Sequence, residues 1–379
     1  MQSVKIETFS PHCLMNKIVT ILTRIINCHY LQKIIGRTHV KYLLFYLVSL
    51  LTFDKNFSQT DMERKLKCCS HDGINRMLRD MKIPVRTFES LLINYIERYR
   101  QRKGWLIIDD TSINKRYSEK IAFTGYCWCS SLGRVAMGMH VVTLLWTDGE
   151  HSFPVGYRIW RPRDENNPGQ YKTKIELASD LVLSNLDFCL SCEYLVFDSW
   201  YCSKKFLSGM SSLGIACISS LKRNRNLMVH ERTVKVKDLP QDFAGVVSLP
   251  GFGSVRVFCT TIGKREHCLV STDINISSAQ VRKRYKHRWP VEEFFRAIKQ
   301  YLGFERCQCR TEQAVINHIM IVFLGYVTLE VIRESSGLTH GEIKRCLQDK
   351  FYIYYDPGKK HGQTENENRK LKRILKHVA

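Results

Sequence analysis

The sequence predicts an α/β protein in which a mixed β-sheet is preceded and followed by helical regions. Two short runs, Trp105–Asp110 and Glu193–Trp200, are apolar at successive positions, as expected for central strands covered on both faces. Strand-like and helix-like segments alternate between these runs and after them. At 379 residues, the chain is long enough to bury a large core and to form two or three domains.

Residues 1–103 are predicted to form a helical N-terminal domain. Residues 34–53 have the length of a buried helix, and residues 58–81 have the pattern of two short amphipathic helices. Ser70 is the expected N-cap of the second short helix, and Gly104 ends the next helical segment. A helix-turn-helix at Ser58–Met81 would suit binding to DNA ends, but packing alone explains the pattern equally well.

The first part of the core is predicted to cover residues 104–221. Val135–Trp146 and Ser152–Trp160 are expected strands, separated by an Asp-Gly turn, and residues 172–186 form a helix. The strand that ends at Asp198 follows, then a helix over residues 203–214 and a strand over residues 215–222. Three strands followed by helix, strand, helix and strand is the order of an RNase H-like core.

The remaining chain divides into three predicted segments. Residues 222–276 are β-rich and contain no tryptophan; residues 277–335 complete the core, and residues 336–379 form a helical, basic C-terminal tail. The β-rich segment, an expected insertion, therefore separates the two parts of the predicted core.

Composition favours a polyanionic partner. The 58 lysines and arginines exceed the 36 acidic residues, which gives a formal net charge of +22. This charge favours DNA, RNA or an anionic membrane without distinguishing them. Met1–Thr20 lacks the apolar segment of a signal peptide, and the apolar runs Tyr42–Phe53 and Ile319–Leu329 are shorter than a membrane span. We therefore expect buried helices, a cytoplasmic protein and no membrane partner.

The 15 cysteines do not form a zinc-binding pattern. Cys189 and Cys192 are the one pair with Cys-x-x-Cys spacing, and no second pair follows at the spacing of a zinc finger. Reduced thiols are expected in a cytoplasmic protein. A Gly-rich phosphate-binding loop is also missing from the sequence, so ATP is not an expected cofactor.

The segment 285–310 contains a regular set of chemically distinct side chains. Tyr285, Arg288, Glu292 and Lys299 stand at offsets that fall within roughly 60° of one another on a continuous helix. A carboxylate beside cations suits a helix that lies along a phosphodiester. Pro290 leaves two possibilities: it kinks one helix, or it stands in the first turn of a new one.

This spacing resembles the Tyr-2-Arg-3-Glu-6-Lys signature of the DDE transposases of the insertion-sequence-four family. The resemblance implies that Glu292 is the third catalytic carboxylate and that two aspartates precede it, each at the end of a buried strand. Asp110 and Asp198 fit that description. Asp109 and Asp110 must face opposite sides of their strand, and the Asp-Thr-Thr/Ser string of the family favours Asp110. Glu293, about 100° away on a helix, is the weaker alternative to Glu292.

The resemblance also implies a mechanism and partners. Asp110, Asp198 and Glu292 would hold two Mg²⁺ ions, for which Mn²⁺ can substitute, on an RNase H-like fold. Tyr285, Arg288 and Lys299 would bind DNA. The expected reaction is cutting of double-stranded DNA at the inverted-repeat ends of an element, followed by joining of the 3′-OH to a target, within a homodimer. Two rival functions are a metal-dependent nuclease without strand transfer and an inactive DNA-binding derivative.

Overall fold

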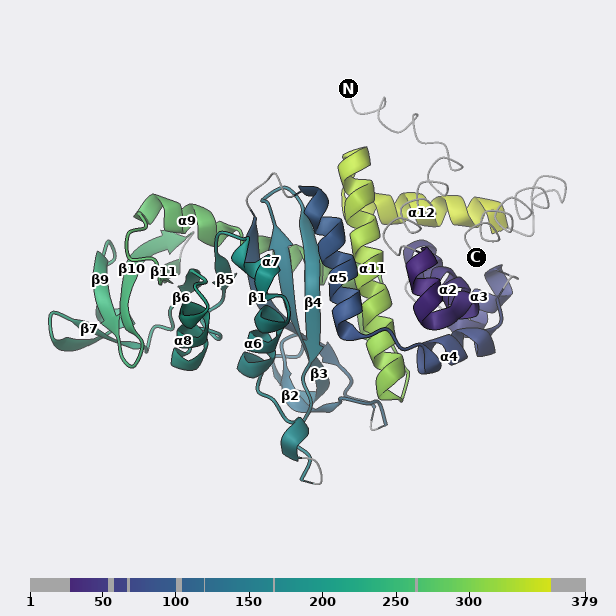
Figure 1. The fold of residues 1–379 in the computed structure, drawn as a ribbon, viewed down its shortest axis with the longest axis horizontal. Helices are drawn as coiled ribbons and strands as arrows, with labels where there is room; N and C mark the ends of the chain where they lie inside the picture. The colour runs from purple at the N-terminus through teal and green to yellow at the C-terminus, as the bar shows by residue number, and fades with distance from the viewer. Residues whose placement is uncertain are drawn as a thin grey trace. The chain divides into compact units, whose positions relative to one another are not determined.

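The computed structural model describes residues 28–53, 58–66, 69–99, 104–118, 120–165, 168–262 and 265–355. They form two compact units. Unit 1 comprises Met1–Tyr95, Glu119–Ala122 and Phe294–Ala379, and unit 2 comprises Ile96–Ser118 and Phe123–Glu293. The predicted α/β class is confirmed, with helices in both units and a mixed sheet in unit 2 (Figure 1). The predicted basic tail lies outside the described residues after residue 355.

The described part of unit 2 is organised around one sheet with the strand order β2-β3-β1-β5-β6-β11-β10-β9-β7-β8, in which β4 also pairs with β3. The strands are β1 (Trp105–Asn114), β2 (Gly125–Cys129), β3 (Arg134–Thr147), β4 (Ser152–Ile159), β5 (Leu195–Phe197), β6 (Cys217–Ser220), β7 (Asn226–Val229), β8 (Arg232–Lys235), β9 (Ala244–Leu249), β10 (Gly253–Ile262) and β11 (Arg265–Ser271). The β-rich segment 222–276 thus contributes strands to the same sheet. The domain boundaries drawn from the sequence stay a prediction.

The buried strands lie where the apolar runs predicted them. β1 pairs along its whole length with β3 in antiparallel orientation, and β3 pairs with β4 in the same way. β5 and β6 run parallel to β1, and Ile108 of β1 stands opposite Phe197 of β5. β5 therefore ends opposite the middle of β1, which continues to Asn114.

Three of the described helices of unit 2, α6, α8 and α9, begin at polar residues that cap them. They are α6 (Lys174–Ser184), α7 (Leu186–Leu190), α8 (Lys204–Ser212), α9 (Ser278–Lys286) and the start of α10 (Trp289–Tyr301), with 3-10 turns η1 (Glu97–Tyr99), η2 (Pro168–Gln170) and η3 (Val236–Asp238). Thr173 and Ser277 each form a capping box, at α6 and α9, and Ser203 caps α8. α6 packs against β3 and β4, whereas α8 and α9 pack against β6 (Figure 1).

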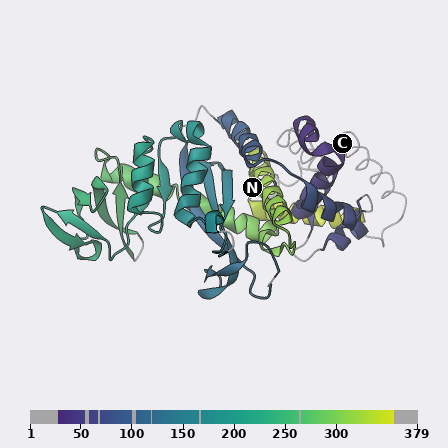
Figure 2. The ribbon, with the colours of Figure 1, turned by 60° about the horizontal axis from the view of Figure 1, so that its bottom comes forward.

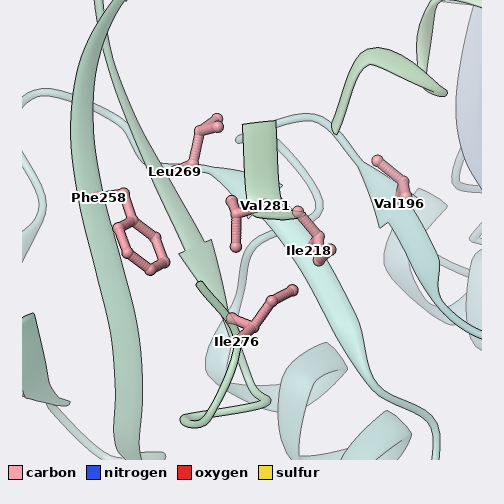
Figure 3. Close-up of a cluster of buried hydrophobic side chains, with 6 residues drawn as sticks. All are labelled: Val196, Ile218, Phe258, Leu269, Ile276 and Val281. Atoms are coloured by element: carbon pink, nitrogen blue, oxygen red, sulfur yellow. The ribbon is translucent and has the colours of Figure 1, made fainter. Parts of the chain in front are cut away.

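A cluster of buried side chains fixes α9 on the sheet (Figure 3). Its members come from β5, β6, β10, β11 and α9 with the preceding loop: Val196, Ile218, Phe258, Leu269, Ile276 and Val281. Tyr194 and Tyr285 are partly buried against it. Because Tyr285, in the last turn of α9, packs against this cluster, the residues that follow the helix are held at a defined position beside the sheet.

One cysteine pair corrects the expectation of reduced thiols. The antiparallel register of β10 and β11 places Cys259 directly opposite Cys268, and the two form a disulfide. The sequence offered no sign of this pairing, because it depends on the register of a hairpin.

The described residues of unit 1 are helical. The helices are α2 (Cys28–Thr52), α3 (Gln59–Leu66), α4 (His71–Asp80), α5 (Val85–Ile96), α11 (Glu312–Ser336) and α12 (His340–Tyr355), with the 3-10 turn η4 (Phe304–Arg306) and the last part of α10. Ser70 accepts a hydrogen bond from the backbone of Gly73 and caps α4, as predicted. α4 packs against α2 and α11, where the Asn317 amide donates to the carbonyls of Leu78 and Met81.

Two helices of unit 1 are longer than the apolar runs that predicted them. Tyr30–Thr52 and Glu312–Ser336 are long and apolar enough to cross a bilayer by length and composition. Within the structure, however, 61% and 89% of their most apolar windows are buried. Both therefore serve as core helices of this unit.

Candidate active site

A guanidinium joins two carboxylates from distant parts of the sequence. Arg288 Nη1 lies 3.2 Å from Asp109 Oδ2, on β1. Arg288 Nη2 also donates to Oε1 of Glu292, in the first turn of α10. The Arg288 and Asp109 side chains are only 20% and 18% exposed, so this pairing is shielded from solvent on most sides.

Asp198 completes the acidic group. It directly follows Phe197, whose partner on β1 is Ile108, so the next residue of each strand is expected at the same level and on the same face. Asp198 Oδ1 accepts hydrogen bonds from the backbone N–H groups of Trp200, at 2.9 Å, and Tyr201, at 3.4 Å. These contacts hold the carboxylate at the edge of the sheet.

The local field at this edge is strongly negative. Burial, followed by the charges of Asp198 and Asp110, raises the pKa of Asp109 to about 7, although Arg288 opposes the shift. Burial is also the main cause that raises the pKa of Asp198 above its usual value. Carboxyl groups with raised pKa values, gathered around one cation, are typical of a site that binds further positive charge.

Asp110 has different surroundings. Its Oδ1 accepts a hydrogen bond from the Tyr201 hydroxyl at 2.9 Å, and its Oδ2 lies 2.8 Å from His140 Nδ1. The Lys174 ammonium contacts both oxygens, at 2.9 and 3.1 Å. Burial alone would raise the pKa of Asp110, but His140 and Lys174 outweigh it and lower the pKa overall.

The two adjacent aspartates therefore do different things. Asp109 shares Arg288 with Glu292, whereas both oxygens of Asp110 are already occupied by donors on the other side of the strand. The sequence favoured Asp110 for the catalytic position. In the structure Arg288 contacts Asp109 and Glu292, and the register of β1 with β5 sets Asp109, rather than Asp110, on the face that Asp198 is expected to share.

Pro290 stands in the first turn of a new helix. α9 ends at Lys286 and α10 begins at Trp289, so the second of the two predicted possibilities holds. The junction is fixed by the His287 ring, which stacks on Trp105 of β1 with ring centroids 3.9 Å apart. Arg288 follows this stack, and its position beside Asp109 results from it.

The break between α9 and α10 divides the predicted stripe of side chains between these two helices and their junction. Tyr285 lies on α9 and packs against the buried cluster, where burial raises the pKa of its hydroxyl. Lys299 lies seven residues after Glu292 on α10 and forms an ion pair with Glu305 at 3.2 Å. Glu293 is exposed, in agreement with its weaker ranking. Of the predicted DNA-binding residues, Arg288 contacts Asp109 and Glu292, and the Tyr285 hydroxyl lies close enough to Arg288 and Asp198 for both to affect its pKa.

The sequence interpretation missed three residues of this region: His140, Lys174 and Tyr201. His140 and Lys174 lie on β3 and at the start of α6, far from the motifs, and only the folded sheet brings them to Asp110. Tyr201 stands three residues after Asp198, so its proximity to that aspartate was the one available signal.

The donor set suits a hard divalent cation. Asp109, Asp198 and Glu292 offer only carboxylate oxygens, the ligands that Mg²⁺ and Mn²⁺ prefer. Within the part of the chain that the structure describes, no three acidic, histidine or cysteine side chains converge closely enough to hold an ion. Arg288, placed between Asp109 and Glu292, supplies the neighbouring positive charge in this arrangement.

Comparison with known proteins agrees with an acidic nuclease site. Residues 30–242, more than half of the chain, match the family of DDE superfamily endonucleases. The chain belongs to this family. The matched region contains Asp109, Asp110 and Asp198 and ends before Glu292.

Two named relatives are transposases. Over 72 residues, the chain is 37% identical to a probable transposase for insertion sequence element IS5377 from Geobacillus stearothermophilus, an alignment that covers 19% of each protein. Over 166 residues, it is 20% identical to a probable transposase for insertion sequence element IS701 from Microchaete diplosiphon. The second alignment covers 43% of this chain and 44% of the relative. The chain thus spans less than half the length of either relative.

Proposed function

We propose that this DDE endonuclease is the transposase of an insertion sequence. It would cut double-stranded DNA at the ends of the element and join the freed 3′-OH to target DNA. The observation that carries the proposal is that Arg288 joins Asp109 of β1 to Glu292 of α10, while the register with β5 sets Asp198 beside Asp109, in a family member whose named relatives are transposases. The net charge of +22 supports a nucleic-acid substrate.

The strand arrangement supports an RNase H-like core. β4, β3 and β1 form an antiparallel meander, and β5 and β6 continue the sheet in parallel with β1. This arrangement agrees with the order expected from the sequence. It sets Asp198, directly after β5, beside Asp109 in the middle of β1, where side chains from different segments can act on one phosphate.

We propose Asp109, Asp198 and Glu292 as the ligands of two Mg²⁺ ions, with Asp109 in place of the Asp110 that the sequence favoured. When bound, such ions supply activation of the attacking water or 3′-OH and stabilisation of charge on the phosphate. The protein's own contribution is positional. Two backbone N–H groups orient Asp198, and the junction of α9 and α10 holds Arg288 and Glu292 beside β1.

Asp110 is proposed as a positioning residue. The Tyr201 hydroxyl donates to Asp110, while the Tyr201 backbone N–H points to Asp198. Asp110 thereby ties the loop after β5 to β1. Lys174 supports the same loop, because its ammonium lies 4.2 Å above the Trp200 ring while it contacts Asp110.

Basic residues next to the acidic group are suited to DNA phosphates. Ser199, directly after Asp198, lines a cavity of about 320 Å³. Lys222, Arg223 and Lys237 line the same cavity. Arg288 is suited to two-pronged phosphate contact once a metal compensates the carboxylates. Tyr285 and Lys299 stay proposed DNA contacts, as do a homodimer as the working form and action in the cytoplasm.

The proposal is tested with a cleavage and joining assay on DNA that flanks this protein's gene. Wild type, Asp109→Asn and Asp110→Asn are compared with Mg²⁺, with Mn²⁺ and with EDTA, and Glu293→Gln serves as the control on α10. We expect metal-dependent cuts at two matching inverted ends, followed by joining to a second DNA. Asp109→Asn should abolish both steps, and Glu293→Gln should leave them unchanged.

Each other result points to a defined alternative. Metal-dependent cutting without end preference or joining would indicate a nuclease. Tight binding without cutting under any condition would indicate an inactive derivative. Full activity of Asp109→Asn together with complete loss in Asp110→Asn would return the first ligand position to Asp110.

A further inference from the structure

The sheet of unit 2 continues beyond β1 as a two-stranded ribbon. β2 pairs with the first residues of β3 in antiparallel register, from Gly125 opposite Gly138 to Cys129 opposite Arg134. β1 ends at Asn114, which pairs with Gly138 of β3, so the residues of β3 before Gly138 extend beyond the end of β1. Figure 2 shows these two strands extending from the rest of the sheet.

The outer face of this ribbon carries large apolar side chains. Tyr126 and Trp128 are 76% and 57% exposed, and Val135, the cross-strand partner of Trp128, is 60% exposed. Residues directly opposite each other or two apart on a strand share one face, so these three side chains form a continuous surface. Cys129 and Ala136, on the other face, are buried. Such clustered exposure is typical of a binding surface.

The ribbon is fixed in place. The backbone N–H of Ser130, in its turn, donates to the Ser112 hydroxyl of β1 at 3.1 Å, and the N–H of Lys115 donates to the Met137 carbonyl at 3.0 Å. Gly138 permits this close packing, because a Cβ there would lie 2.8 Å from both Cys129 Sγ and a β1 carbonyl. A partner would therefore meet a preformed surface and would pay little entropy to order it.

The charges around the outer face suit a polyanion. Between residues 111 and 147 the sequence has four basic residues and one acidic residue. The Arg116 guanidinium lies 4.5 Å from the centre of the Tyr117 ring, which is 85% exposed, and Arg134 begins β3 as an exposed residue. A second copy of this chain would oppose arginines with arginines, whereas DNA offers phosphates to the cations and base edges to the apolar side chains.

We propose that the outer face of the β2–β3 ribbon enters the major groove of the DNA substrate. That groove admits a two-stranded β-ribbon. Tyr126, Trp128 and Val135 contact base edges and thymine methyl groups, and Arg116 contacts a flanking phosphate. This inference rests on the proposed function, because it names the part of the protein that grips the DNA on which the carboxylates act.

The test measures binding of the full chain to duplexes from the DNA that flanks its gene, in EDTA so that cleavage cannot interfere. The double variant Tyr126→Ala/Trp128→Ala should bind at least about tenfold more weakly, by analogy with losses measured for aromatic contacts to bases. Arg116→Ala should lower the slope of log K against log salt by about 0.9. Val246→Ala and Arg232→Ala, exposed on β9 and β8, are matched controls that should leave binding unchanged.

A second measurement identifies the groove. Dimethyl sulfate methylates N7 of guanine in the major groove, so wild type should protect a set of guanines that the double variant leaves reactive. Because these side chains are exposed, urea unfolding should show an unchanged stability. Unchanged affinity and protection in the double variant would overturn the inference, as would a loss of self-association without a change in DNA binding.

Failure of this inference is distinguishable from failure of the proposed function. Ribbon variants that still bind, cut and join like wild type would remove only the ribbon proposal. Wild-type protein that neither binds nor cuts the flanking DNA would overturn both.

Discussion

Asp109→Asn and Asp110→Asn should change the stability of unit 2 in opposite directions. Asp109 lies in a buried, negatively charged group, and its folded-state pKa is about 7 against an ordinary value of 3.8. Asp110 faces His140 and Lys174, which lower its pKa. Removing the charge therefore relieves repulsion at Asp109 and breaks an attraction at Asp110.

The magnitude for Asp109 follows from the pKa difference. In the unfolded chain the carboxyl ionises above about pH 4, and in the folded protein only above about pH 7. The stability associated with this group is therefore fully present below the lower pKa and is lost as pH rises through the upper one. A pKa difference of about 3, at about 1.4 kcal/mol for each pH unit, sets an upper value of about 4 kcal/mol for the change in the free energy of unfolding. Asp109→Asn should therefore stabilise the folded protein by about 2–4 kcal/mol at pH 8.

Asp110→Asn should show the reverse. Its side chain is 12% exposed, and the Lys174 ammonium that it contacts is 20% exposed. Removing one partner of a mostly buried pair costs about 3 kcal/mol, because the other charge is left without compensation. This loss should be present at pH 8 and still largely present at about pH 4, because the stabilisation disappears only as pH falls through the depressed folded-state pKa of Asp110, below 3.8.

The assay is urea unfolding in EDTA, followed by tryptophan fluorescence at about pH 4 and about pH 8. Near pH 4 the stabilising effect of Asp109→Asn should vanish. Two variants that both destabilise unit 2 by similar amounts at pH 8 would refute the assignment of the two aspartates to different surroundings.

Three further changes test other contacts. Glu292→Gln should abolish cleavage and leave DNA binding in EDTA nearly unchanged; loss of binding would make Glu292 structural. Tyr201→Phe removes the hydroxyl that donates to Asp110, so it should cost about 1–3 kcal/mol and lower kcat more than it raises KM; unchanged kcat would count against its positioning role. Burial by itself would raise the pKa of Glu330, but His340 and Arg333 outweigh burial and lower it. The stability that Glu330 supplies should therefore be lost as pH falls through its depressed pKa. Glu330→Gln should lower the free energy of unfolding by about 3 kcal/mol at neutral pH, and urea titrations should then show a smaller loss of stability at low pH. An unchanged loss of stability at low pH would exclude the ion pair as its cause.

Burial patterns made the strands and helices predictable. The apolar runs that end at Asp110 and Asp198 became β1 and β5, because only strands covered on both sides need hydrophobic residues at every position. Ser70 was found as an N-cap because its hydroxyl replaces a missing backbone partner within the same few residues. Such local causes are visible in a sequence.

The finer geometry of the site depends on pairing between distant segments. Alternation along β1 shows that Asp109 and Asp110 face opposite sides, but only the register with β5 decides which of them accompanies Asp198. The angular stripe of side chains assumed one helix, and Pro290 begins another instead. The Cys259–Cys268 disulfide likewise depends on the register of β10 and β11.

Arg288 is expected to compete with a divalent cation for the same carboxylates. Its guanidinium contacts both Asp109 and Glu292, so an ion bound by these two residues must displace it. Arg288→Gln removes the competitor, and Mg²⁺ should then raise the urea midpoint of unit 2 more than in wild type. Tenfold tighter binding would add about 1.4 kcal/mol at saturating Mg²⁺.

The same variant should lose cleavage, because the displaced guanidinium is the proposed contact to the phosphate. Arg282→Gln, exposed on α9, is the matched control and should show the wild-type response to Mg²⁺. Equal stabilisation of wild type and Arg288→Gln by Mg²⁺ would mean that the ion does not bind where Arg288 lies. Tighter Mg²⁺ binding combined with lost cleavage would instead assign Arg288 two successive roles: a counter-charge before the metal binds, and a grip on the DNA afterwards.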